Sequence, residues 1–287
     1  MKYLYSTVLF IIFLFVLTTV IDFNYVQEVE NVDMDGNNIS KIVVDIDDAN
    51  VSLSSTVDKD IKIEHLYSQS QYETSNLYTY QEGDILYVNE YPYNKTNLIT
   101  KKETINIYIP EEYEFDEIDV TTESGEINVD SLKTGIFKVM SNTGNIDIAN
   151  LNANKIGISG DQLGVNVSNI VAKEFNASIA KSQFTISNSI VNSLKVENAQ
   201  TSKVNVSKLV AEDVTVVGEN TDVNLKLNEG IGYKIISNLQ IGNPRLTVED
   251  DGYSYLENNL KKATTYNLKD VQSVSINFET LAEDTDE

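Results

Sequence analysis

The sequence predicts an all-β fold: a single-domain β-solenoid, which is a β-helix-like stack of two-strand coils of about 19 residues, preceded by an N-terminal transmembrane or signal segment. Three observations predict this fold. Apolar residues recur about every 19 residues through residues 115–229, they alternate with polar residues inside each unit, and residues 3–21 are uncharged. Apolar residues at i and i+2 share one side of a strand but not of a helix, so the repeat indicates stacked strands.

The first element is the uncharged stretch of residues 3–21. As a helix it approaches the roughly 30 Å thickness of the hydrocarbon core of a bilayer. Thr18 to Asp22 lack the small side chains of a signal-peptidase site, which favours an uncleaved signal-anchor over residues 1–21; a cleaved signal peptide is the alternative. Lys2 before the segment and the acidic chain after it favour a single-pass protein of the cell membrane with the bulk of the chain extracellular. Residues 22–40 are then a juxtamembrane linker.

The repeat supplies the core of the solenoid. In its first unit Ile118, Val120, Ile127 and Val129 belong to two strands, and Leu132 closes the corner. Two further units keep a strict 19-residue period, and three later units slip by single residues. Their equivalent residues are Phe137, Val139, Ile146, Ile148, Leu151; Ile156, Ile158, Val165, Val167, Ile170; Phe175, Ala177, Phe184, Ile186, Ile190; Leu194, Val196, Val204, Val206, Leu209; and Val214, Val216, Val223, Leu225. These positions predict one continuous apolar interior.

Polar residues mark the turns between the strands. Gly125 and Gly144 lie between the two strands of their units, where glycine adopts positive φ without steric cost. A second set recurs beside the apolar corner: Asn150, Asn169 and Asn188, with Ser131 and Ser207 in register. This second set predicts a ladder in which each amide bonds its neighbours above and below.

Regions on both sides of the repeat are expected to cap it, because an open coil exposes a pairing edge. Ile42, Val44, Val51 and Leu53 show the same spacing as the first unit, so a first coil begins there and the solenoid spans residues 41–280. The main repeats occupy 115–229, the caps 41–114 and 230–280, and a tyrosine-rich insertion about 67–93. Residues 281–287 form an acidic tail that we expect to be disordered.

The segment from Ile118 to Val129 also carries a family resemblance. Its Thr122-Glu123-Ser124-Gly125-Glu126-Ile127 turn, preceded by a strand that ends at Pro110, resembles the bacterial putative-adhesin family of short β-strand repeats, a domain of unknown function. The resemblance implies a membrane-anchored envelope protein of the Gram-positive type. It implies no activity and no site residues.

Composition excludes several functions. The chain has 44 acidic and 21 basic residues and a formal net charge of −23, so its surface repels nucleic acid and anionic lipid. It has no cysteine, which removes disulfides, thiolate metal sites and thiol nucleophiles. No motif indicates a cofactor.

Two chemical functions remain as alternatives. A polysaccharide-active solenoid enzyme needs catalytic side chains, but Arg245 and His65 are the sole arginine and histidine, and neither has an obvious partner in the sequence. A calcium-dependent surface assembly protein needs oxygen ligands, for which Asp45, Asp47 and Asp48 are weak candidates. A solvated acidic face is the favoured explanation of these aspartates, so we predict no metal site. Because neither Arg245 nor His65 has a catalytic partner in the sequence, we also predict no enzyme.

Tyrosine clustering is the strongest recognition signal. Tyrosine offers rigid, amphipathic contact area against sugars or proteins, although alternating tyrosines also pack ordinary hairpins. Seven of the 16 tyrosines fall in the insertion: Tyr67, Tyr72, Tyr78, Tyr80, Tyr87, Tyr91 and Tyr93. The sequence therefore predicts a non-enzymatic surface protein, an adhesin or an envelope scaffold or sensor, that is held in the membrane by residues 3–21 and meets a protein or glycan partner through these tyrosines.

Overall fold

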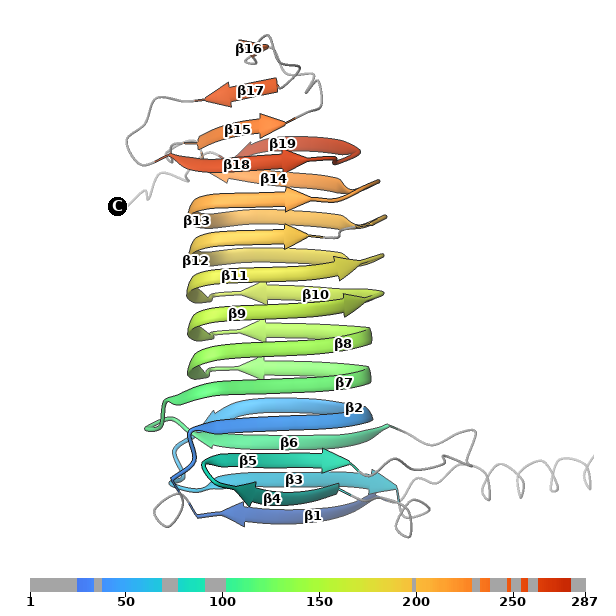
Figure 1. Cartoon of the computed structure of the whole chain (residues 1–287), viewed down its shortest axis with the longest axis vertical. Helices are drawn as coiled ribbons and strands as arrows, with labels where there is room; N and C mark the ends of the chain where they lie inside the picture. The colour runs from blue at the N-terminus through green and yellow to red at the C-terminus, as the bar shows by residue number, and fades with distance from the viewer. Residues whose placement is uncertain are drawn as a thin grey trace, which may run out of the picture.

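The computed structural model describes residues 25–33, 38–68, 77–90, 102–197, 200–228, 233–237, 247–248, 254–257 and 263–279. Every regular element among them is a β-strand, and the strands stack into a flattened rod (Figure 1). The strands are β1 (Tyr25–Val32), β2 (Lys41–Thr56), β3 (Ile61–Ser68), β4 (Leu77–Glu82), β5 (Ile85–Glu90), β6 (Glu103–Pro110), β7 (Phe115–Asp130), β8 (Lys133–Ala149), β9 (Asn152–Asp161), β10 (Leu163–Ser168), β11 (Val171–Ala180), β12 (Gln183–Glu197), β13 (Lys203–Val217), β14 (Asp222–Asn228), β15 (Tyr233–Ser237), β16 (Thr247–Val248), β17 (Ser254–Glu257), β18 (Thr264–Lys269) and β19 (Ser273–Glu279).

The long strands bend, so each coil contributes to two sheets that face one another. The front sheet is nearer the viewer in Figure 1 and begins with β4 and β5. It continues through the first halves of β2, β7 and β8 to β9 and β11. The second halves of β12 and β13 follow, and then β18, β15 and β17. The back sheet runs from β1, β3 and β6 through the other halves of β2, β7 and β8 to β10, β12, β13, β14 and β19. The solenoid-like, all-β architecture predicted from the repeat is confirmed.

The apolar positions of the repeat lie in register inside the rod. Ile118 pairs with Phe137, and Phe137 with Ile156, while Ile127 pairs with Ile146 on the opposite sheet. Every predicted strand position of the six units is at most 2% exposed. Ile42 pairs with Ile118 as the shared spacing predicted. Stacking therefore buries apolar surface that no single coil could cover alone.

Residues in the left-handed backbone conformation turn the chain from the back sheet into the front sheet of the next coil. Ser131, Asn150, Asn169, Asn188 and Lys208 all have φ between 47° and 59°. Asparagine tolerates this conformation best among residues with side chains, which explains its recurrence. The predicted amide ladder exists in part: Asn150 donates to Asp130 at 2.7 Å and Asn169 to Asn150 at 3.4 Å. The prediction that Ser207 belongs to this series is wrong, because Lys208 occupies the position equivalent to Asn188.

One predicted corner residue is also wrong. The buried corner next to Ile170 and Leu209 is filled by Ser189, which is 2% exposed, whereas Ile190 is 52% exposed. The Ser189 hydroxyl donates to the Ser187 carbonyl at 2.7 Å and accepts the Ile170 backbone N–H at 3.3 Å. Because both hydrogen-bonding roles are satisfied, a polar residue replaces the apolar corner. Apolarity alone could not show this.

The opposite corner, from the front sheet to the back sheet, changes along the rod. In β7, β8 and β9 it is built on Gly125, Gly144 and Gly160, with φ of 146°, 130° and 152°. A Cβ at Gly144 would lie 1.9 Å from the Gly125 carbonyl oxygen, so no other residue fits there. Farther along, Lys181, Thr201 and Asn220 turn the corner in the left-handed region instead. Each is followed by a buried hydroxyl, from Ser182, Ser202 and Thr221 respectively.

Both ends of the rod depart from chain order. At the N-terminal end β2 lies between β5 and β6 on one side and β7 on the other, although β7 follows β6 in the sequence. At the other end β18 lies between β13 and β15. Antiparallel pairs then finish each sheet: β3 with β6, β4 with β5, and β17 with β15. Strands β3 and β5 belong to different sheets, and within the tyrosine-rich insertion β4 pairs with β5 as an antiparallel hairpin.

The predicted membrane segment, residues 3–21, lies outside the described residues, as does the acidic tail. Within the described ranges no helix is long and apolar enough to cross a membrane.

Candidate recognition face

The outward side of the front sheet brings the central tyrosines together. Tyr80 of β4 pairs directly with Tyr87 of β5, and their rings stack with centroids 4.7 Å apart and planes 7° from parallel. Tyr78 lies two residues before Tyr80 on the same strand, and these rings stack at 5.6 Å. Strand alternation places Tyr87 outward because Leu86 and Val88 point into the core. The three rings form what we call the tyrosine stack.

Of the other tyrosines predicted to meet a partner, the structure describes Tyr67, which is not part of the stack. Tyr67 is 2% exposed: it faces the core, its hydroxyl donates to Glu28 at 2.8 Å, and its ring lies 4.7 Å from that of His65. Its place in the recognition set was therefore wrong, because Tyr67 occupies an inward position of β3. Tyr72, Tyr91 and Tyr93 lie outside the described residues.

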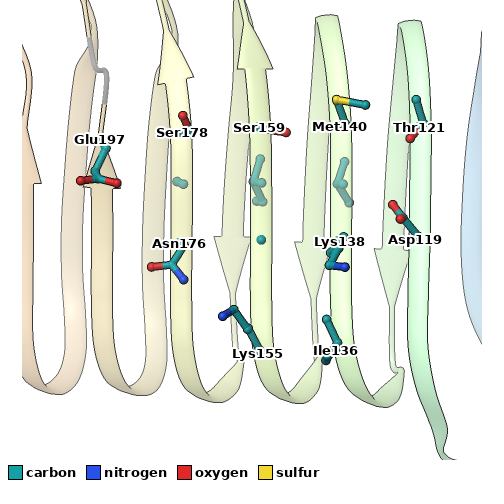
Figure 2. Close-up of a pocket in the computed structure, with 14 residues that line it drawn as sticks. Asp119, Thr121, Ile136, Lys138, Met140, Lys155, Ser159, Asn176, Ser178 and Glu197 are labelled. Atoms are coloured by element: carbon teal, nitrogen blue, oxygen red, sulfur yellow. The ribbon is translucent and has the colours of Figure 1, made fainter.

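A hollow of about 390 Å³ lies on the same side of the front sheet. It centres on Gly157 of β9, whose missing side chain leaves a gap in an outward row. A Cβ there would meet nothing closer than Lys138 Cγ at 3.8 Å, so the gap is not required by the backbone. Met140 and Ile136 supply apolar lining, and Figure 2 shows the polar side chains that surround it, among them Asn176, Ser159 and Ser178. Met140 is 49% exposed.

Strand register joins the tyrosine stack to the hollow. Successive outward residues are Tyr80, Tyr87, Val43, Asp119, Lys138 and Gly157. Between Tyr87 and Gly157 lie four strand spacings, or roughly 19 Å. The clustered tyrosines were predicted from the sequence, but this hollow was not. The signal was present: Gly157 replaces a side chain at the position of Asp119, Lys138 and Asn176 in the 19-residue period.

Charges on this face are paired rather than concentrated. Glu117 bonds Lys138 at 2.8 Å and Lys41 at 3.0 Å, and these bonds, that from Lys138 above all, hold the pKa of the Glu117 carboxyl below its ordinary value. The pKa of the Asp119 carboxyl is shifted in the opposite direction, because burial raises it more than the neighbouring lysines lower it. Lys155 pairs with Glu174 at 3.2 Å. The hollow is therefore rimmed by compensated ion pairs.

His65, which was considered as a catalytic candidate, lies away from the front-sheet face. His65 and Glu103 form a buried pair, with Nε2 2.9 Å from Oε2 and both residues at most 3% exposed, inside the N-terminal end of the rod. The sequence pattern does not reveal this partner, because the two residues come from different strands, β3 and β6. Arg245 lies outside the described residues.

The three aspartates do not form an ion site. Asp45 and Asp47 are exposed, Asp48 accepts from Ser124 at 2.6 Å and pairs with Lys102 at 2.9 Å, and the Asp47 backbone N–H donates to Glu90 at 3.2 Å. Across the part of the chain that the structure describes, no three acidic or histidine side chains converge as metal ligands would.

Fold and surface together define a class of protein: a solenoid-like β-repeat rod that presents stacked aromatic rings and a shallow hollow on one sheet. The chain belongs to the Toastrack DUF4097 family, whose model matches residues 39–233. The family predicted from the repeat residues is therefore confirmed. A comparison with curated proteins gives no match.

Solved structures share this fold at low identity. One is described as a putative lipid binding protein from Parabacteroides distasonis, with 12% identity, a TM-score of 0.52, and coverage of 92% of this chain and 99% of the other. A putative adhesin from the same organism has 12% identity, a TM-score of 0.50, and coverage of 91% and 99%. At such identity the likeness establishes the fold alone. Neither protein is described as an enzyme.

Proposed function

We propose that this chain is a non-enzymatic, adhesin-like protein of the cell surface, held in the membrane by residues 3–21, whose front sheet binds a partner. The observation that carries the proposal is the shared outward row that runs from the tyrosine stack to the Gly157 hollow. Stacked tyrosines offer rigid contact area at low entropic cost, and a hollow beside them accepts a protruding group. The description of one structural neighbour as a putative adhesin agrees with a binding role.

Partner capture on intact cells tests the binding face. Full-length protein carrying Tyr80→Ala and Tyr87→Ala is compared with the wild type by cross-linking and mass spectrometry. The matched control is Tyr108→Ala, since Tyr108 faces outward on the back sheet in β6. We expect the front-sheet variant to lose the enriched partner and the control to keep it. Equal enrichment in all three proteins would contradict a front-sheet binding site.

A second variant addresses the hollow without disturbing the backbone. Gly157→Leu fills the gap, where a Cβ meets only ordinary van der Waals contact. We expect unchanged melting and weaker partner capture. If capture is unchanged while the tyrosine variant fails, the hollow plays no part in recognition.

Membrane attachment needs its own experiment. We expect the full chain to fractionate with membranes, to be digested by protease added to intact cells, and to keep residues 1–21 at its mature N-terminus. An N-terminus near residue 22 would instead identify a cleaved signal peptide, and protection of the rod from protease would place it inside the cell.

A further inference from the structure

The outward side of the back sheet carries a column of short polar side chains. From β6 to β19, one position on each strand is asparagine, serine, threonine or aspartate. In stacking order the column consists of Asn106, Ser52, Asn128, Asp147, Asn166, Thr185, Asn205, Asn224 and Ser275. We call it the amide column. At the usual strand spacing of about 4.8 Å it is roughly 38 Å long.

Hydrogen bonds along the rod hold the amide column in place. Asn166 donates to Asp147 at 2.8 Å, and farther along the rod Asn224 donates to Asn205 at 3.0 Å. Asn205 in turn donates to the Thr185 hydroxyl at 3.2 Å. A carboxamide has two N–H donors and two acceptor lone pairs, so one bond in each direction leaves both a donor and an acceptor for a ligand. The side chains concerned are exposed or half-buried.

The chemistry of the amide column selects among possible ligands. Protein interfaces depend on buried aromatic, large apolar or arginine anchors, and neither the column nor the neighbouring Ser168, Ser187 and Ser207 provides one. Tyr108 belongs to the same neighbouring row but lies at its β6 end, beside Asn106. Nucleic acids and acidic glycans are disfavoured by the net charge of −23 and by Asp147 within the column. What remains is a neutral polymer rich in hydroxyl groups, since hydroxyls both donate and accept.

We propose that the amide column binds a neutral, linear polysaccharide lying along the rod axis. Each coil presents one polar rung, so the rungs recur at a constant spacing, as do the hydroxyl groups of a linear glycan. The bonds between rungs fix the side chains before binding, which lowers the entropic cost of each contact. Single contacts are weak, and affinity accumulates along the strip. This site is separate from the front-sheet face of the proposed function.

Affinity electrophoresis tests the proposal with full-length protein in a neutral detergent. Gels contain hydroxyethylcellulose as a neutral linear polysaccharide, or alginate as an acidic one. We expect retardation in hydroxyethylcellulose and none in alginate, with cello-oligosaccharides competing better as their length increases. Migration unaffected by hydroxyethylcellulose, or stronger retardation in alginate, would overturn the proposal.

Matched triple variants assign the binding to one sheet. The test variant is Asn166→Ala, Thr185→Ala and Asn205→Ala on the back sheet. The control removes the same residue types from the front-sheet strands β11, β12 and β13: Asn176→Ala, Asn192→Ala and Thr215→Ala. We expect the test variant to bind about tenfold more weakly, as the loss of several hydrogen bonds implies, and the control to bind as the wild type does. Equal behaviour of both triples contradicts the site.

A further variant guards against a folding defect. Ser187→Lys leaves the side-chain hydrogen bonds of the amide column intact but places a long side chain beside Thr185 and Asn205, on the same side of the sheet. We expect normal thermal unfolding and lost retardation. Normal unfolding with full retardation would remove the back sheet as the binding surface. Tyr80→Ala should leave the retardation unchanged, so failure here and failure of the front-sheet proposal are distinguishable.

Discussion

The two outer faces of the rod use one repeat in different ways. On the back sheet the outward residues are periodic like the buried ones, and the same short polar residue types recur coil after coil in the amide column. On the front sheet the outward residues change from coil to coil, from Tyr87 through Asp119 and Lys138 to Gly157. The interior demands apolar residues at fixed positions, but an outward position is free of that demand. A regular surface suits a periodic ligand, and an irregular one suits a single partner.

The shared interior should yield the largest effect. Phe175 of the front sheet is fully buried, and its ring lies 5.7 Å from that of Phe184 on the back sheet. Phe175→Ala should lower the free energy of unfolding by about 4 kcal/mol. Urea denaturation followed by circular dichroism and by tyrosine fluorescence should shift together. Lys173→Ala, at an exposed site, is the control; a loss confined to one probe would mean that the two faces are not coupled through the core.

Gly144 and Gly157 differ in role: the backbone requires a glycine at Gly144, whereas Gly157 only shapes the surface. A Cβ at Gly144 collides with a backbone oxygen at the corner joining both sheets, whereas one at Gly157 meets no close atom. Gly144→Ala should therefore cost about 3 kcal/mol. Gly157→Ala should leave stability unchanged or raise it by about 0.5 kcal/mol, because it reduces the freedom of the unfolded chain. Thermal unfolding measures both, and similar losses at both positions would refute the distinction.

The smallest effects concern two carboxyls on the front face. The lowered pKa of Glu117 means that its ion pairs stabilise the fold above the unfolded pKa and that this contribution disappears as pH falls through the folded pKa. Glu117→Gln should thus cost about 0.5 kcal/mol at neutral pH, allowing for the half-exposed lysine, and nothing in acid. The raised pKa of Asp119 has the opposite sign: its carboxylate opposes folding at neutral pH, so Asp119→Asn should raise stability there.

Denaturation at a series of pH values, with both variants beside the wild type, measures these differences. A Glu117→Gln effect that persists in acid would show that packing, not charge, accounts for it. Asn205→Ala on the back sheet is the comparison, because it removes an amide and no ion pair. Its effect on stability should not vary with pH, since amides do not titrate.

The sequence alone was enough to predict the interior of the rod. Alternation and a period near 19 placed every strand position correctly, because burial between two sheets admits only apolar side chains at those positions. It could also have located the amide column, since Asn128, Asp147, Asn166 and Thr185 recur at the same offset. Recurrence at the surface is less regular than in the interior, because several polar residue types satisfy one outward position equally well.

Tertiary structure decided which surfaces these residues form. Ser189 replaces an apolar corner because its hydroxyl accepts the Ile170 N–H of the neighbouring coil while it donates to the Ser187 carbonyl of its own coil, and the apolar pattern does not encode the contact between coils. His65 meets Glu103, and Tyr67 turns into the core, because β3 pairs with β6 rather than with the insertion. The order of coils at both ends likewise depends on pairing between distant strands. Periodicity fixes what is buried within a coil, whereas contacts between coils distant in sequence fix which side chains meet.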